Sequence, residues 1–193
     1  MTAQTDIISA TVLIVPGLRE HVADHWQTLL ARKLPRVRSV APLEHDKLSC
    51  AERVAAIDRA LASIDGPVIV VAHSAGVMML AHWASRCKSR AIHGALLAAP
   101  ADLETPMPPG YPTIDALDAH GWLPVPRDVL PFPSIVAGSS NDPLTGLDRA
   151  REFARSWGSR FVELGDVGHL NPASGHGEWP MAEEFISQLA TPR

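Results

Sequence analysis

The feature that most constrains the fold is an alternation of short apolar runs with longer segments of helical periodicity along this 193-residue chain. Such alternation is typical of βα units that build a parallel sheet. Several of the runs are apolar throughout, as strands are when helices cover both faces of a sheet. We predict six strands: Thr11–Val15, Val37–Ala41, Val68–Ala72, Ala95–Ala99, Ser134–Gly138 and Arg160–Leu164. The expected class is α/β, a three-layer α/β/α sandwich.

The segments between these runs carry signals for helices. Ser49 and Glu52 form a capping-box pattern, and the stretch after them has apolar residues at spacings of three and four until Gly66-Pro67. Earlier in the chain, one helical face holds Val22, Trp26, Leu29 and Leu30. Further helices are predicted from Ser74 to about Cys87, from about Leu147 to Trp157, and from about Met181 to Leu189.

One segment, at about 100–133, breaks this alternation. It holds nine of the seventeen prolines. Proline cannot donate a backbone hydrogen bond and disfavours helix at the residue before it, so we expect irregular chain here. A loop of this length in a compact domain is usually functional or disordered. No internal repeat or second domain is evident, and we expect one domain over 1–193 that carries this proline-rich insertion.

Composition and charge argue against several classes of protein. Apolar residues make up 46% and charged residues 20%, as in ordinary globular proteins. The net charge of −4 is not that of a typical nucleic-acid-binding protein, which carries an excess of Lys and Arg. No apolar run approaches the ~20 residues of a membrane span, and the first residues do not resemble a signal peptide. Cys50 and Cys87 lack metal-type spacing and are interpreted as free thiols of a reducing compartment. A cytoplasmic protein without a membrane partner is expected.

Residues 70–80, Val-Val-Ala-His-Ser-Ala-Gly-Val-Met-Met-Leu, pass directly from a strand pattern to a helix pattern at Ser74. This is a near match to the G-x-S-x-G nucleophile elbow, in which a strained turn exposes the serine hydroxyl. Ala72 stands where the first glycine is usual, and Gly76 keeps the second small position. The alternative is a serine that merely caps the helix after a buried strand.

A serine nucleophile needs a base, and the base needs an orienting acid. Asp142 directly follows the fifth predicted strand and His169 follows the sixth. The order Ser, Asp, His along the chain is the order of the α/β-hydrolase triad, so we predict Ser74, Asp142 and His169 as catalytic residues. Taken singly, Asp142 could be a turn residue and His169 a solvated loop side chain. His176 is a second, weaker candidate for the base, and Asp166 lies too close in sequence to orient His169 easily.

An acyl-transfer site also needs hydrogen-bond donors for the developing oxyanion. The backbone N–H of Ala75 qualifies because it follows the nucleophile at a helix N-terminus. The second donor is predicted to be the backbone N–H of Leu18, in the loop after the first strand, with Gly17 either shaping that loop or lining the substrate site.

Other residues receive weaker predictions. Trp26 and Trp122 are candidates to border the substrate pocket, although tryptophan is more often a core residue. His21 and His25 have an i, i+4 spacing that could hold a metal, but no third ligand is obvious. We therefore expect no metal and no cofactor. His73 is expected to point away from the nucleophile and to pack or bond locally.

The chain resembles the α/β-hydrolase superfamily, and within it the small YdeN-like serine hydrolases related to retinoblastoma-binding protein 9. The resemblance covers nearly the whole chain. It implies a compact domain without a large cap, the triad named above, and six parallel strands in the order 2-1-3-4-5-6, two N-terminal strands fewer than the full hydrolase fold. The motifs that carry it are Val15-Pro16-Gly17, His73-Ser74-Ala75-Gly76, Ser140-Asn141-Asp142-Pro143, Gly168-His169-Leu170-Asn171 and Ser174-Gly175-His176-Gly177-Glu178-Trp179-Pro180.

The leading hypothesis is a cofactor-independent serine hydrolase that cleaves a small carboxylic ester, or an amide, through an acyl-enzyme. The short insertion favours small or short-acyl substrates over those of lipases with large lids. Two alternatives stay open. The first is a protein-interaction module with a vestigial triad, since fold does not fix function and the family is associated with protein binding. The second is acyl transfer to an acceptor other than water.

Overall fold

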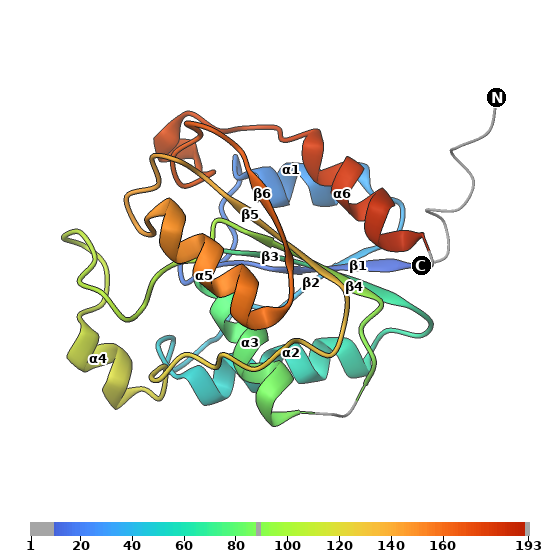
Figure 1. Cartoon of the computed structure of the whole chain (residues 1–193). Helices are drawn as coiled ribbons and strands as arrows, with labels where there is room; N and C mark the ends of the chain where they lie inside the picture. The colour runs from blue at the N-terminus through green and yellow to red at the C-terminus, as the bar shows by residue number, and fades with distance from the viewer. Residues whose placement is uncertain (1–9, 88–89, 192–193) are drawn as a thin grey trace.

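The structure is a computed structural model that describes residues 10–87 and 90–191, and it contains a six-stranded sheet between two layers of helices (Figure 1). All strand pairs are parallel, in the order β2-β1-β3-β4-β5-β6, as predicted. The strands are β1 (Thr11–Val15), β2 (Val37–Ser39), β3 (Val68–His73), β4 (Gly94–Ala98), β5 (Ser134–Gly138) and β6 (Arg160–Glu163).

The two faces of the sheet are covered by different helices, because alternate residues of each strand point to opposite sides. Leu13 and Val15 pack with α2, α3 and α5, whereas Val12 and Ile14 pack with α1 and α6. The helices are α1 (Trp26–Lys33), α2 (Cys50–Ala62), α3 (Ala75–Arg86), α4 (Ile114–Ala119), α5 (Leu147–Trp157) and α6 (Met181–Ala190). Among the described residues, none of these helices combines the length and apolar character needed to span a membrane.

β1 lies between β2, which follows it in the chain and pairs with one of its edges, and β3, which pairs with its other edge. The carboxyl ends of β1 and β3 are therefore a topological switch point, where parallel α/β sheets form their ligand sites. The loop after β1 and the turn after β3 both open at this position. The sheet thus places the predicted oxyanion loop and the predicted nucleophile side by side.

Several element boundaries differ from the predictions. β2 ends at Ser39 rather than at residue 41: its last register pair is Ile14 with Ser39, and the Val40 N–H makes one further bond to the Ile14 carbonyl at 3.0 Å. α1 begins at Trp26, because the His25 side chain caps it, so Val22 lies in the preceding loop. The proline-rich segment holds one short helix, α4, which Thr113 caps by accepting from the Ala116 N–H.

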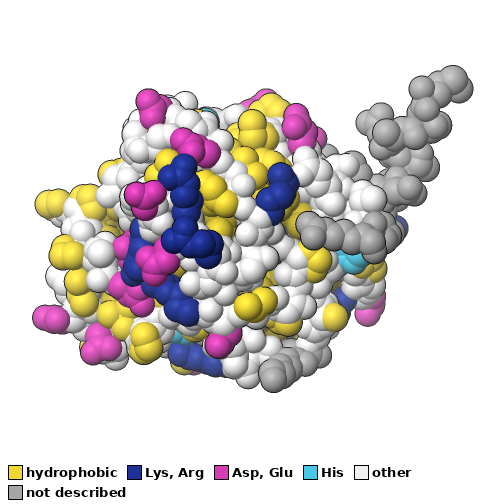
Figure 2. All heavy atoms as spheres, viewed as in Figure 1, with side chains coloured by type: hydrophobic (Ala, Val, Ile, Leu, Met, Phe, Trp, Pro, Cys, Tyr) yellow, Lys and Arg dark blue, Asp and Glu magenta, His cyan; other side chains and the backbone are white. Residues whose placement is uncertain are grey.

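Charged side chains of both signs interleave over α5 on the face drawn in Figure 2. Arg149 of this helix pairs with Glu152 at 2.8 Å and with the buried carboxylate of Asp102 at 3.1 Å. The Asp102 backbone N–H also donates to Thr145 Oγ1 at 2.7 Å. Because Asp102 begins the proline-rich segment, these contacts fix the start of that segment beside the loop after β5.

Candidate active site

Ser74 lies at a strained turn between β3 and α3. Its φ of 59° and ψ of −128° are unfavourable for any residue with a side chain, as the nucleophile elbow requires. The turn is held by the Ser74 N–H, which donates to the Ala98 carbonyl at 3.1 Å. The Ser74 side chain makes no capping bond to α3, so the hydroxyl is directed elsewhere.

Gly76 and Ala72 have different reasons to be small. A Cβ at Gly76 would lie 2.4 Å from the carbonyl oxygen of Val15 and 2.7 Å from that of Pro16. The first turn of α3 therefore packs directly on the backbone at the end of β1, and only glycine fits. Ala72 is fully buried in the core on β3, and its methyl group is accommodated there.

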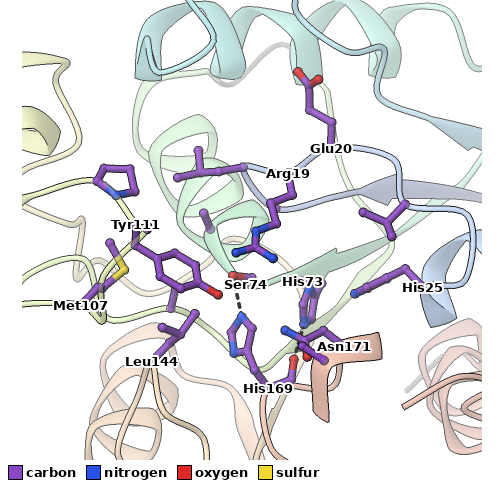
Figure 3. A pocket seen from close by; sticks show the side chains of 18 of the residues that line it. Arg19, Glu20, His25, His73, Ser74, Met107, Tyr111, Leu144, His169 and Asn171 are labelled. Carbon is purple, nitrogen blue, oxygen red and sulfur yellow. Dashed lines mark hydrogen bonds between the residues drawn. The ribbon is translucent and has the colours of Figure 1, made fainter. Parts of the chain in front are cut away.

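Three loops bring Ser74, His169 and Asp142 into one chain of hydrogen bonds, of which Figure 3 shows the bond between Ser74 and His169. The distance from His169 Nε2 to Ser74 Oγ is 2.8 Å. His169 Nδ1 lies 2.8 Å and 2.9 Å from the two carboxylate oxygens of Asp142. Since a carboxylate accepts only, Nδ1 carries the proton and Nε2 is free to accept from the serine hydroxyl. The imidazole is thus oriented as a base toward Ser74.

The acid loop and the histidine loop are tied together by side chains that bond to backbone groups. Asn141 Oδ1 accepts from the Gly168 N–H at 2.6 Å. Ser139 Oγ donates to the Gly165 carbonyl and accepts from the Val167 N–H, both at 3.2 Å. These contacts hold the loop after β6 against the loop after β5, so His169 and Asp142 meet. The sequence motif contained Asn141, but nothing in its spacing revealed this role.

Two further histidines pack beside His169. The His73 ring lies 4.9 Å from the His169 ring and 4.6 Å from the His25 ring, measured between centroids. His73 Nε2 donates to the backbone carbonyl of His169 at 2.8 Å, a partner 96 residues away in sequence, and His73 lines the same cavity as Ser74. Burial, aided by the neighbouring imidazoles, lowers the pKa of His73 well below its ordinary value. Burial also lowers the pKa of His25 to about 4, so both rings are neutral at pH 7.

The loop after β1 passes directly beside Ser74. A Cβ at Gly17 would lie 3.2 Å from Ser74 Cβ and 3.5 Å from Ser74 Oγ. Gly17 is thus required for close approach rather than for an unusual φ. The next residue, Leu18, lines the same cavity as Ser74 and Ala75. Ala75 is the first residue of α3, where backbone N–H groups have no intrahelical acceptor.

Polar contacts anchor this loop at both of its ends. Glu20, at a φ of 59°, accepts from the Leu43 N–H at 2.9 Å and pairs with Arg53 at 3.3 Å. Although burial opposes it, the Leu43 amide together with Lys47 and Arg53 lowers the pKa of Glu20. The buried amide of Gln27 donates to the carbonyl of Val71 at 3.0 Å and to that of Val15 at 3.3 Å. None of these partners was predicted.

A cavity of about 470 Å³ opens at Ser74 (Figure 3). Much of its wall is apolar, and part of that wall comes from the proline-rich segment, which contributes Leu103, Met107 and Tyr111. Polar side chains also line the cavity, among them Asn171 and Arg19, whose guanidinium carbon lies 5.3 Å from the Tyr111 ring centroid. The cavity therefore combines apolar and polar side chains around the serine.

The structure does not bring the two predicted tryptophans to this cavity. Trp26 is 1% exposed and packs edge-on against Trp179, and neither its ring nor that of Trp122 is among the lining residues. Trp122 is fully buried, with its indole N–H donating to the Leu48 carbonyl at 2.6 Å. Both belong to the core, where their large apolar rings are removed from water. That expectation was wrong.

The remaining candidates make other contacts, although His25 lines the same cavity as Ser74. Asp166 is exposed, and His176 bonds through its backbone N–H to the Asn171 carbonyl. The paired residues His21 and His25 are engaged separately: His25 Nδ1 accepts from the Gln27 N–H at 3.2 Å, and His21 Nδ1 lies 3.4 Å from Thr28 Oγ1.

Comparison with known proteins gives a family and a set of similar folds. A family model described as serine hydrolase matches residues 12–188. A YdeN-like hydrolase from Pectobacterium atrosepticum is 27% identical, with a TM-score of 0.80 over 94% of this chain and 91% of that chain. The ydeN gene product of B. subtilis is 15% identical, with a TM-score of 0.76 over 94% and 98% of the two chains. Est1E from Butyrivibrio proteoclasticus, 10% identical, shares the fold at a TM-score of 0.66 over 93% and 86%. A search among curated proteins gives no match.

Proposed function

The chain belongs to the serine hydrolase family, of the α/β-hydrolase superfamily, and from this premise we propose that it cleaves small carboxylic esters through an acyl-enzyme on Ser74. The observation that carries the proposal is the continuous hydrogen-bonded chain from Ser74 Oγ through His169 to Asp142. A serine hydroxyl is a weak nucleophile until an adjacent base removes its proton, and this geometry supplies that base.

Acylation follows from these contacts. As Ser74 Oγ bonds to the ester carbonyl carbon, its proton moves to His169 Nε2 and the carbonyl electron pair moves onto oxygen. Asp142 stabilises the imidazolium that forms. The oxyanion accepts hydrogen bonds from the backbone N–H groups of Leu18 and Ala75. Collapse of this intermediate expels the alkoxide, which takes the proton from His169 and leaves as an alcohol.

Deacylation repeats the sequence with water. His169 Nε2 takes a proton from water as the water oxygen attacks the acyl carbon, and then returns a proton to Ser74 Oγ when the carboxylic acid leaves. The donors to the oxyanion are the same in both steps. The cavity volume of about 470 Å³ lies in the range of small-molecule sites, which supports small esters as substrates.

The test is the intact mass of the folded protein after exposure to a fluorophosphonate probe, together with hydrolysis of 4-nitrophenyl butyrate. We expect one adduct on the parent and on Ser63→Ala, a control that removes an exposed serine remote from the cavity. Ser74→Ala should form no adduct and should lose at least ~10³ of kcat, since the oxyanion donors alone leave only weak catalysis. A folded parent without an adduct, or an adduct on Ser74→Ala, would contradict the proposal.

A further inference from the structure

The charged side chains that line the cavity do not balance one another. They are Arg19, Glu20 and Lys47. Glu20 is already engaged by three partners: its carboxylate accepts from the Leu43 N–H and pairs with Lys47 and with the buried Arg53, each at 3.3 Å. Its negative charge is therefore neutralised on the side of the loop that faces α2. The surplus at the cavity is positive, although the whole chain carries −4.

The surplus charge is that of Arg19. Within residues 10–87 and 90–191, no carboxylate forms an ion pair with this guanidinium. The guanidinium instead makes a cation–π contact with Tyr111, whose ring centroid lies 5.3 Å from the guanidinium carbon. Tyr111 belongs to the proline-rich segment, so the contact holds the guanidinium between that segment and the loop after β1. In Figure 3 the Arg19 side chain extends from its loop toward Ser74 and Tyr111.

We propose that Arg19 makes the site selective for esters that carry an anionic group, a carboxylate or a phosphate, close to the scissile bond. This inference rests on the proposed ester hydrolysis at Ser74. Arginine offers planar, paired donors that match the oxygens of both anions. Arg19 directly follows Leu18, the residue expected to donate to the oxyanion, which places the anion site next to the reacting carbonyl. The apolar wall formed by Leu103, Met107 and Leu144 receives the uncharged part of the substrate.

The test compares matched ester pairs that differ in one anionic group. The acyl-side pair is 4-nitrophenyl hydrogen adipate and its methyl ester. The alcohol-side pairs are 4-acetoxybenzoate with its methyl ester, and 4-acetoxyphenyl phosphate with its dimethyl ester. The readout is the ratio of kcat/KM for the anionic member to that for the neutral member. These pairs separate a carboxylate from a phosphate and also locate the anion on the acyl or the alcohol side.

We expect the parent to favour the anionic member of at least one pair by about tenfold, a modest factor because Arg19 is exposed to solvent. Arg19→Gln should remove this preference, Arg19→Lys should keep part of it, and Arg32→Gln, an exposed arginine of α1, should leave it as in the parent. The preference should also shrink as ionic strength rises, because salt screens an exposed charge.

Two results would overturn the inference while leaving the proposed hydrolysis intact. One is a parent that hydrolyses the neutral esters and shows no preference in any pair. The other is an Arg19→Gln variant that slows both members of each pair equally, which would make Arg19 a loop-positioning residue. A parent that forms no fluorophosphonate adduct and hydrolyses no ester would contradict the proposed function, and this inference with it.

Discussion

Replacement of Gly76 by alanine tests how the oxyanion loop is positioned. The added Cβ would lie 2.4 Å from the Val15 carbonyl oxygen and 2.7 Å from that of Pro16, whereas ordinary contacts begin near 3.4 Å. Both obstructing atoms are backbone, so no side-chain rotation relieves the contact. The end of β1, or the first turn of α3, must move by about 1 Å.

This displacement acts where the two proposed backbone donors lie beside the proposed nucleophile, Ser74. The loop after β1 carries Leu18, and α3 carries Ala75, so a shift between them separates the pair. A misplacement of about 1 Å costs roughly 10²-fold in rate, and loss of one oxyanion donor costs roughly 10²–10³. Overpacking of this kind also lowers the free energy of unfolding by about 1–3 kcal/mol. For a chain of this length, that corresponds to a fall in Tm of roughly 2–12 °C.

The assay is kcat and KM for 4-nitrophenyl butyrate with a thermal unfolding curve for each variant. We expect Gly76→Ala to lose at least ~10² of kcat. The matched control is Gly177→Ala, because a Cβ there meets no atom within 4 Å and its φ is not in the left-handed region. A Gly76→Ala protein with the kcat and Tm of the parent would refute the steric argument, while a fall in Tm alone would show that the donors do not depend on this contact.

Two more changes test the polar contacts around the site. His25 has a pKa of about 4 in the folded protein against an ordinary value of 6.5, so the unfolded chain binds more protons between these limits and stability falls as pH drops from about 6.5 to about 4. His25→Asn keeps an acceptor for the Gln27 N–H but removes the titrating imidazole. Urea unfolding should show that, between pH 7 and pH 5, this variant loses roughly 2 kcal/mol less of its free energy of unfolding than the parent does. A variant that loses as much as the parent would contradict this prediction. Glu20→Gln should lower stability by about 1–3 kcal/mol, because it leaves the buried Arg53 without its carboxylate, and should lower kcat more than it raises KM. A variant as stable and as active as the parent would show that this ion pair does not hold the loop.

The sheet could be predicted because its signal is local and repeated. Each apolar run marks a strand, and the resemblance gives the order in which the strands lie. The meeting of Ser74, Asp142 and His169 also follows from this pattern, since each residue comes directly after a strand and the carboxyl ends of parallel strands share one edge. The structure brings these three together, and their catalytic role stays a proposal.

The predictions failed for side chains whose position in the fold depends on contacts with residues distant in sequence. Trp26 and Trp122 were placed at the pocket, yet both lie in the core, because residue type alone cannot separate a core indole from a lining one. The lining residues Met107 and Tyr111 were missed, since the prolines around them predict irregular chain without predicting its path. Gln27 was missed because its partners are carbonyl groups 12 and 44 residues away.

The two neutral histidines connect the packing of the site to its proposed chemistry. In that mechanism His169 becomes an imidazolium, and a second cation within 5 Å would oppose this step. The His73 ring, 4.9 Å away, is buried, and its Nε2–H is used by the His169 carbonyl, so it donates to the backbone and does not compete for the Ser74 proton. His25 behind it is kept neutral by the same burial. In the proposed mechanism Asp142 stabilises the charge on His169, and the burial that destabilises the fold in acid also keeps the two neighbouring rings uncharged during the proton transfer.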